Sequence, residues 1–251
     1  MFAAKQLYTN DVYNQTANPE GGLQFGTIGV DEFGDVYRYA QIGASNVTAG
    51  KLQLAPVAKT NHHNVAAAAA VALDGKNRTV TLTLGATAAV AGEYEGGLLV
   101  ASDASPEGEV YRITKSSAAD SSGVLTVVVD RPFVSAIATT SEFTVVHNPW
   151  NGVVEEAVAT RAAAGVPLID MTATYYGWLK VRGVAAVLAG GTIAIGNAVV
   201  PSGSTAGAVI EQDVFVNATD ATRLDAKVVV GRADQVAGVS TEYRPITLSI
   251  L

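Results

Sequence analysis

The histidines are the residues best suited to metal or acid–base chemistry, and their spacing argues against both. His62 and His63 are adjacent, so on an extended chain their rings point to opposite faces and cannot bind one metal ion together. His147 stands alone between an apolar run and Asn-Pro-Trp, a setting that favours a structural role. We expect a turn or subunit-contact role for the pair and no metal site.

Carboxylates lie close together in two places, at Glu155 and Glu156 and in the run Asp31, Glu32 and Asp35. A glycosidase pair would have to lie on opposite sides of a sugar cleft, and a role as turn or surface acids needs nothing further. The second run could attract Ca²⁺, but the EF-hand spacing is missing. A hydrolase that uses Glu155 or Glu156 against polysaccharide is one functional hypothesis for the chain, and it is weaker than the two described below.

Other catalytic and cofactor motifs are missing from the sequence. Cysteine is absent, which excludes disulfides, thiolate metal sites and a cysteine nucleophile. No Gly-x-Ser-x-Gly elbow links a strand to a helix, and the glycines between 190 and 196 lie between strands, with no helix N-terminus to hold phosphate. We therefore predict no catalytic, cofactor-binding or metal-ligating residue, no cofactor and no enzyme activity.

Trp178 is the best candidate for a carbohydrate platform. On a strand it shares one face with Lys180 and Arg182, and Tyr175 and Tyr176 precede it. A half-buried strand is the preferred interpretation, because aromatic rings pack well on a pleated surface.

The elements that position these residues are strands. Five runs rich in β-branched residues follow one another from 79 to 148, at 79–85, 96–102, 108–116, 123–130 and 141–148, with Gly-rich turns between them. Alternation and turn chemistry of this kind predict a compact antiparallel sheet. The fold class is therefore all-β, with two antiparallel barrel or sandwich domains.

Earlier in the chain, Phe33-Gly34-Asp35 separates two alternating runs and predicts a hairpin turn. The pentapeptide 34–38, Gly-Asp-Val-Tyr-Arg, recurs as Gly-Glu-Val-Tyr-Arg at 108–112, which suggests that one turn-to-strand structure is used twice. The Ala-rich stretch 61–77 is expected to be an extended connector, with a single helix as the alternative.

The predicted organisation has four parts. An extended N-terminal arm covers 1–30, a β-domain 31–150, a linker 151–170 and a C-terminal β-barrel 171–251. The linker could form a two-turn helix that ends at Gly165. The pattern leaves open whether the two β regions are separate domains.

Charge and hydropathy restrict the partners. The net charge of −7 and the scattered basic residues argue against nucleic acid. No run approaches the length of a membrane span, and the N-terminus lacks the apolar core of a signal peptide. We expect a protein made in a cytosol that does not contact a membrane.

The N-terminal segment carries spaced aromatic residues, Phe2, Tyr8, Tyr13 and Phe25. It can be a poorly ordered terminus or an arm whose aromatic residues dock on a neighbouring subunit.

The order of these features resembles a family of head structural proteins of tailed bacteriophages, the capsid decoration or cement proteins. The matching segments are the hairpin Gly34 to Tyr39, the strand Ala49 to Leu52, the Ala-rich connector 61–72, and the motifs at 84–87, 96–97, 108–113, 148–150 and 176–178. The likeness covers most of the chain.

The resemblance implies a virion protein, made in the host cytoplasm, that binds the outer surface of an assembled capsid and stabilises it. Its partners would be the major capsid protein and neighbouring copies, as a homotrimer, with the N-terminal aromatic residues as contacts. The alternative is a tail or fibre component that binds a host-surface glycan through Trp178.

Overall fold

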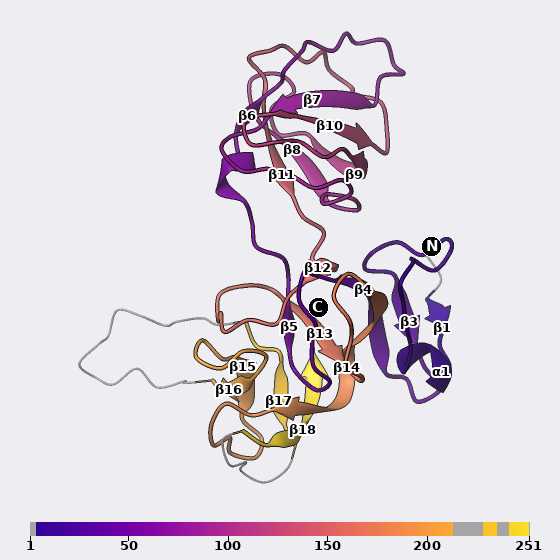
Figure 1. Cartoon of the computed structure of the whole chain (residues 1–251), viewed down its shortest axis with the longest axis vertical. Coiled ribbons are helices and arrows are strands. Elements are labelled where there is room, and N and C mark those ends of the chain that lie inside the picture. The colour runs from indigo at the N-terminus through magenta and orange to yellow at the C-terminus, as the bar shows by residue number, and fades with distance from the viewer. Residues whose placement is uncertain (1–3, 213–227, 235–240, 251) are drawn as a thin grey trace, which may run out of the picture. The chain divides into compact units, whose positions relative to one another are not determined.

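The computed structural model describes residues 4–212, 228–234 and 241–250. Their regular structure is almost entirely β-strand, which confirms the all-β class. The described helical turns are α1 (Thr9–Val12) and the 3-10 turn η1 (Thr60–His62). The chain forms two compact units: unit 1 contains Met1–Pro56 and Gly152–Leu251, and unit 2 contains Val57–Asn151 (Figure 1). No helix in the described ranges is long and apolar enough to cross a membrane.

Unit 2 is a six-stranded antiparallel sheet with the order β6-β11-β8-β9-β10-β7. A bridge between Ala67, just after β6, and Leu82 of β7 links the first strand of this order to the last. The strands are β6 (Val65–Ala66), β7 (Thr79–Thr83), β8 (Leu98–Asp103), β9 (Val110–Ser116), β10 (Val124–Val129) and β11 (Glu142–Val146). The ends of the last five lie within two residues of the ends of the predicted runs, so the predicted antiparallel sheet is confirmed.

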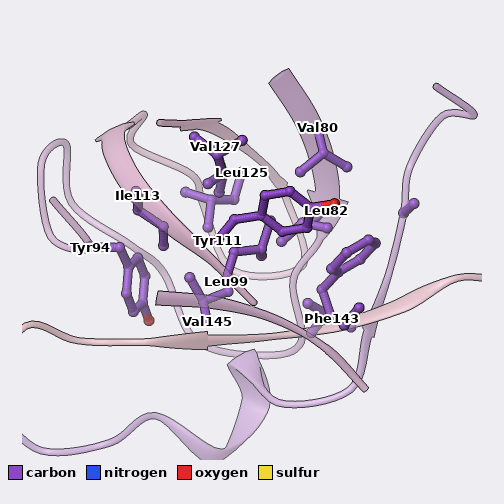
Figure 2. Packing of buried hydrophobic residues seen from close by; sticks show 14 of the residues in the cluster. Val80, Leu82, Tyr94, Leu99, Tyr111, Ile113, Leu125, Val127, Phe143 and Val145 are labelled. Atoms are coloured by element: carbon purple, nitrogen blue, oxygen red, sulfur yellow. The ribbon is translucent and has the colours of Figure 1, made fainter. Parts of the chain in front are cut away.

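Alternating side chains fill the interior of unit 2. Val80 and Leu82 of β7 and Leu125 and Val127 of β10 are buried, while their neighbours along each strand are more exposed. Figure 2 shows these side chains meeting Phe143 in one cluster. Each large apolar side chain buried in this way contributes about 1.5–3 kcal/mol to stability. Unit 2 therefore has a hydrophobic core of its own.

Unit 1 is built on a 12-stranded sheet whose main path runs β1-β3-β4-β14-β18-β17-β15-β16. β1 and β3 pair in parallel, and the central pairs of β14 with β4 and β18 are antiparallel. The strands are β1 (Lys5–Gln6), β2 (Gln15–Thr16), β3 (Ile28–Val30), β4 (Val36–Ile42), β5 (Gln53–Leu54), β12 (Asn151–Val153), β13 (Ala163–Pro167), β14 (Tyr176–Leu188), β15 (Ala198–Pro201), β16 (Val209–Glu211), β17 (Gly231–Ala233) and β18 (Tyr243–Ser249).

The 13-residue strand β14 joins the two halves of unit 1. Its first half pairs with β4, from Tyr176 opposite Gln41 to Arg182 opposite Val36. Its second half pairs with β18 as far as Leu188. Strands from the start and the end of the chain therefore share one sheet.

This pairing divides the chain differently from the sequence-based prediction. Residues 31–56 belong with the C-terminal strands rather than with 57–151, and 151–170 contributes β12 and β13 to unit 1 instead of forming a linker. Strand pairing over more than 100 residues leaves no local signal in the sequence, which explains the difference.

The two-turn helix expected before Gly165 does not form. Residues 163–167 are the strand β13, buried at all five positions, in which Ala163 pairs with Leu54 and Val166 with Lys180. The preference of alanine for helix amounts to less than about 1 kcal/mol per residue, so tertiary burial overrides it. In the connector 61–77 the extended interpretation holds, since the described structure is the end of η1 followed by β6 and isolated bridges.

The described part of the N-terminal segment is tied to unit 1 instead of extending as an arm. Leu7 and Val12 are buried, and the Leu7 N–H donates to the Val30 carbonyl at 2.9 Å, next to the parallel pair of β1 with β3. These buried side chains give the segment a fixed place in the fold.

Candidate functional site

A cleft of about 640 Å³ opens in unit 1 beside the turn that joins β3 to β4. Its walls come from α1, from this turn, from the segments at 49–50 and 167–168, and from the second half of β14. The volume lies in the range of small binding sites.

The turn on one side of the cleft is held by Asp31. Its Oδ1 accepts hydrogen bonds from the N–H groups of Phe33 and Asp35, both at 2.9 Å, and its Oδ2 accepts one from the Tyr37 hydroxyl at 3.1 Å. Gly34 has φ +83°, which only glycine adopts at little cost. The predicted hairpin turn is confirmed, and it presents the Phe33 ring, which is 82% exposed, beside the cleft.

Lys180 of β14 contacts the same turn through its ammonium group. It is 6% exposed, and its ammonium contacts the Asp35 carboxylate and donates to the Val184 carbonyl at 3.0 Å. A buried ammonium is stable only when it is paired, so Asp35 balances its charge. Burial and the nearby Asp31 carboxylate raise the pKa of Tyr37, which keeps its hydroxyl protonated and able to donate.

The cleft keeps an excess of negative charge. Asp31, Glu32 and Asp35 bring three carboxylates to it against the one ammonium of Lys180, which leaves two negative charges. Within the described residues, neither Asp31 nor Glu32 forms an ion pair, and Glu32 is exposed. Asp31 holds the turn and Asp35 pairs with Lys180, so Glu32 is the acid that faces solvent and can meet a cationic group.

The structure places the four predicted contact residues differently. Tyr8 and Tyr13 flank α1 and are 68% and 55% exposed, and Tyr13 lines the cleft. Phe25 is half-buried and stacks on Tyr176, with ring centroids 6.1 Å apart. Phe2 lies outside the described residues. Tyr8 and Tyr13 are thus available to a partner, whereas Phe25 packs within unit 1.

Trp178 is not a carbohydrate platform. It is only 2% exposed and packs in a cluster with Leu7 and Tyr39, whose ring centroid lies 5.3 Å from its own. Even the preferred interpretation of a half-buried side chain underestimated its burial. An inaccessible ring cannot stack on a sugar.

The paired glutamates have separate structural contacts. Glu155 binds the Lys51 ammonium at 2.6 Å and accepts the Thr48 N–H at 3.0 Å, and Glu156 pairs with Arg161. Each carboxylate is therefore used to hold a loop of unit 1.

The histidines of unit 2 also have structural contacts. His62 is fully buried; the Thr87 carbonyl can only accept, so Nε2–H donates to it at 2.7 Å, and Nδ1 accepts from the Tyr94 hydroxyl. His147 donates from Nε2 to the Glu93 carboxylate at 3.0 Å, which confirms its structural role. The described residues contain no group of three or more His, Cys, Asp or Glu that could hold a metal ion.

Sequence reasoning found the acids at 31–35 but not the cleft. Lys180, Val184 and Tyr243 join the acids only through the long-range pairing of β14 with β4 and β18. The run of acids beside an exposed Phe33 was the only local signal.

Comparisons with protein-family models, curated proteins and solved structures gave no match.

Proposed function

We propose that this chain is a virion structural protein that decorates the outer surface of an assembled bacteriophage head. Its partners would be the major capsid protein and neighbouring copies of itself in a homotrimer. The proposal is supported chiefly by Tyr8 and Tyr13, two exposed aromatic rings on a segment that buried side chains hold rigidly. Tyrosines are enriched at the centres of protein interfaces, because they bury much area at little entropic cost.

The anchoring of the two rings is local. The Asp11 carboxylate accepts the Tyr8 N–H at 2.8 Å, and the Tyr13 N–H donates to the Thr9 carbonyl at 3.2 Å. Leu7 and Val12 lie buried beneath α1. A ring on a rigid segment loses little further freedom on docking.

A lattice protein needs many modest contacts and no active site. Binding that occurs only on the assembled shell stabilises the shell by mass action, and neighbouring copies add avidity. The structural contacts of Glu155, Glu156, His62 and His147 are compatible with such a role. The glycan-binding alternative loses support, because Trp178 is buried.

Substitution of both tyrosines by alanine tests the proposal. We expect Tyr8→Ala/Tyr13→Ala to weaken binding to assembled capsids by at least about tenfold with an unchanged unfolding temperature, since both side chains are exposed. Val124→Ala, at a half-exposed position of unit 2, is the control and should bind normally. Co-sedimentation with assembled capsids and with free capsid subunits measures both affinities.

Full affinity of the double variant, or equal binding to capsids and free subunits, would contradict the proposal. Quantitative mass spectrometry of purified particles adds an independent measurement: a copy number equal to that of the major shell protein, or a simple fraction of it, is expected. Deletion of the whole segment is unsuitable as a test, because it would also remove the buried Leu7 and Val12.

A further inference from the structure

The second half of β14 has a strand neighbour on one edge only within the described chain. Pairing with β4 stops where Arg182 faces Val36, whereas β18 continues along the other edge to Leu188. The segment that lacks a second neighbour, Val184 to Ala186, lines the cleft.

The hydrogen bonds show which way the peptide groups of this segment point. The Ala189 N–H donates to the Glu242 carbonyl at 2.8 Å and the Ile250 N–H to the Val181 carbonyl at 2.9 Å, so odd-numbered residues of β14 bond towards β18. Bonding alternates along an antiparallel strand, so Val184 and Ala186 point to the opposite edge. The even-numbered Leu188 shows the same alternation, because its N–H donates to the Gly50 carbonyl at 3.0 Å and not to β18.

One acceptor on this edge is already used, because Lys180 donates to the Val184 carbonyl. In the described part of the chain, no hydrogen bond joins the N–H groups of Val184 and Ala186 to another group. The Ala186 carbonyl is less accessible, because the backbone of Gly50 lies beside it, and the two N–H groups are therefore the open part of this edge. Val184 and Ala186 are both exposed. An open edge of this kind is a template for another extended chain.

The side chains around the edge specify the chemistry of that chain. The excess carboxylate charge, with Glu32 exposed, favours a cation. The exposed rings of Phe33, Tyr13 and Tyr243, at 82%, 55% and 44%, can face an ammonium or guanidinium group. Alanine and valine side chains of β14 supply an apolar surface for small apolar residues.

We propose that the cleft binds an extended segment of another protein, which adds a short strand along Val184–Ala186 and places an arginine or lysine beside Glu32 and the Phe33 ring. A second copy of this chain is a poorer occupant, because its net charge is −7. The proposal rests on unit 1 alone and does not depend on the virion role.

Fluorescence anisotropy with synthetic peptides tests this proposal on the full chain. The probe is a labelled peptide of about six residues that alternates valine and threonine around one arginine, the length of an average strand. We expect saturable binding. We also expect a loss of at least about tenfold in affinity when glutamate replaces the arginine, or when alternate backbone nitrogens of the peptide are methylated.

A matched pair of protein variants separates the site from overall charge. Glu32→Lys should weaken the arginine peptide by at least about tenfold, whereas Glu107→Lys, the same charge change at an exposed position of unit 2, should leave it unchanged. Neither side chain forms a hydrogen bond or an ion pair with the residues that the structure describes, so both variants should keep the wild-type unfolding temperature.

Three results would overturn the proposal: no saturable binding up to about 1 mM peptide, equal binding of the methylated peptide, or equal binding of the glutamate peptide. Full displacement of the probe by the neutral oligosaccharide maltohexaose would assign the cleft to glycans instead.

Discussion

Two buried tyrosines show how one short sequence produces the same local structure in both units. In each copy of the repeated pentapeptide, a glycine with positive φ ends the turn, and the tyrosine is buried. The tyrosine hydroxyl donates a hydrogen bond to a carboxylate, and the arginine guanidinium donates one to a glycine carbonyl. The pairs are Tyr37–Asp31 and Tyr111–Glu109 for the hydroxyls, and Arg38–Gly26 and Arg112–Gly96 for the guanidinium groups. The suggestion that one turn-to-strand structure is used twice is confirmed.

At the same scale, Glu93 is the most strongly stabilised carboxylate of unit 2. Its Oε1 accepts from the Lys59 ammonium at 2.6 Å and from His147 at 3.0 Å, and its Oε2 accepts the Val90 N–H at 2.9 Å. Burial raises the pKa of Glu93, but the hydrogen bonds together outweigh it and hold the pKa at about 2. The ionised form therefore stabilises the folded unit.

We expect Glu93→Gln to lower the free energy of unfolding by about 3–4 kcal/mol at pH 7, because the pKa falls from 4.5 to about 2 and each pKa unit corresponds to about 1.4 kcal/mol. The folded pKa lies below the ordinary value of 4.5, so the contribution is complete above about pH 4.5 and is lost as pH falls towards 2. Urea unfolding at pH 7 and near pH 3 measures the change.

The control is Glu107→Gln, at an exposed position in the same unit. It should be neutral at both pH values. An equal effect of Glu93→Gln at both pH values would show that ionisation of Glu93 does not contribute.

At the scale of elements, β14 depends on a glycine at the point where its pairing with β4 ends and its pairing with β18 continues. Gly183 has φ +103°, and a Cβ there would fall on the Asp35 carboxylate, 2.6 Å from its Cγ. Glycine is therefore required both for the backbone conformation and for the contact between Asp35 and Lys180.

We expect Gly183→Ala to destabilise unit 1 by about 2–4 kcal/mol, because it combines backbone strain with displacement of the partner of a buried lysine. Gly191→Ala is the control, since nothing lies within 4 Å of a Cβ at that position. Thermal unfolding measures both variants, and a neutral Gly183→Ala would contradict this account of β14.

Strands with one buried face were predicted well, whereas for strands covered on both faces the prediction missed either the burial, as in β14, or the strand itself, as in β13. The strands of unit 2 alternate between buried and more exposed positions, so their period of two is visible in the sequence. In β14 five consecutive residues, Gly177 to Val181, are buried, and β13 is buried throughout. Strands covered on both faces lose the alternation, so Trp178 was misjudged and β13 was mistaken for a helix.

At the scale of the whole molecule, unit 2 is inserted into unit 1 at a paired point. Leu54 and Val154 exchange two backbone hydrogen bonds, of 2.9 and 3.0 Å, just outside the inserted segment. Each unit has its own buried clusters. The boundaries could not be predicted, because the pairing that defines unit 1 spans the insertion.

We expect unit 1 to fold when residues 57–151 are replaced by a short Gly-Ser loop, since the two ends already lie together. Its unfolding temperature should stay within about 5 °C of the corresponding transition of the full chain. Circular dichroism and calorimetry measure this outcome. Deletion of residues 1–14, which removes the buried Leu7 and Val12, is the destabilised comparison. An unfolded excision variant would show that unit 1 needs unit 2.

The insertion also sets the order of events during synthesis. β4 leaves the ribosome well before β14, because all of unit 2 is translated between them. At typical rates of 5–20 residues per second that interval is on the order of ten seconds. Tyr37 and Tyr39, which the finished sheet buries, lack the β14 part of their cover during that time. Unit 2 can therefore complete its core before the first strands of unit 1 have their partner β14. During that time chaperones or other nascent copies of the chain can bind the unpaired β4.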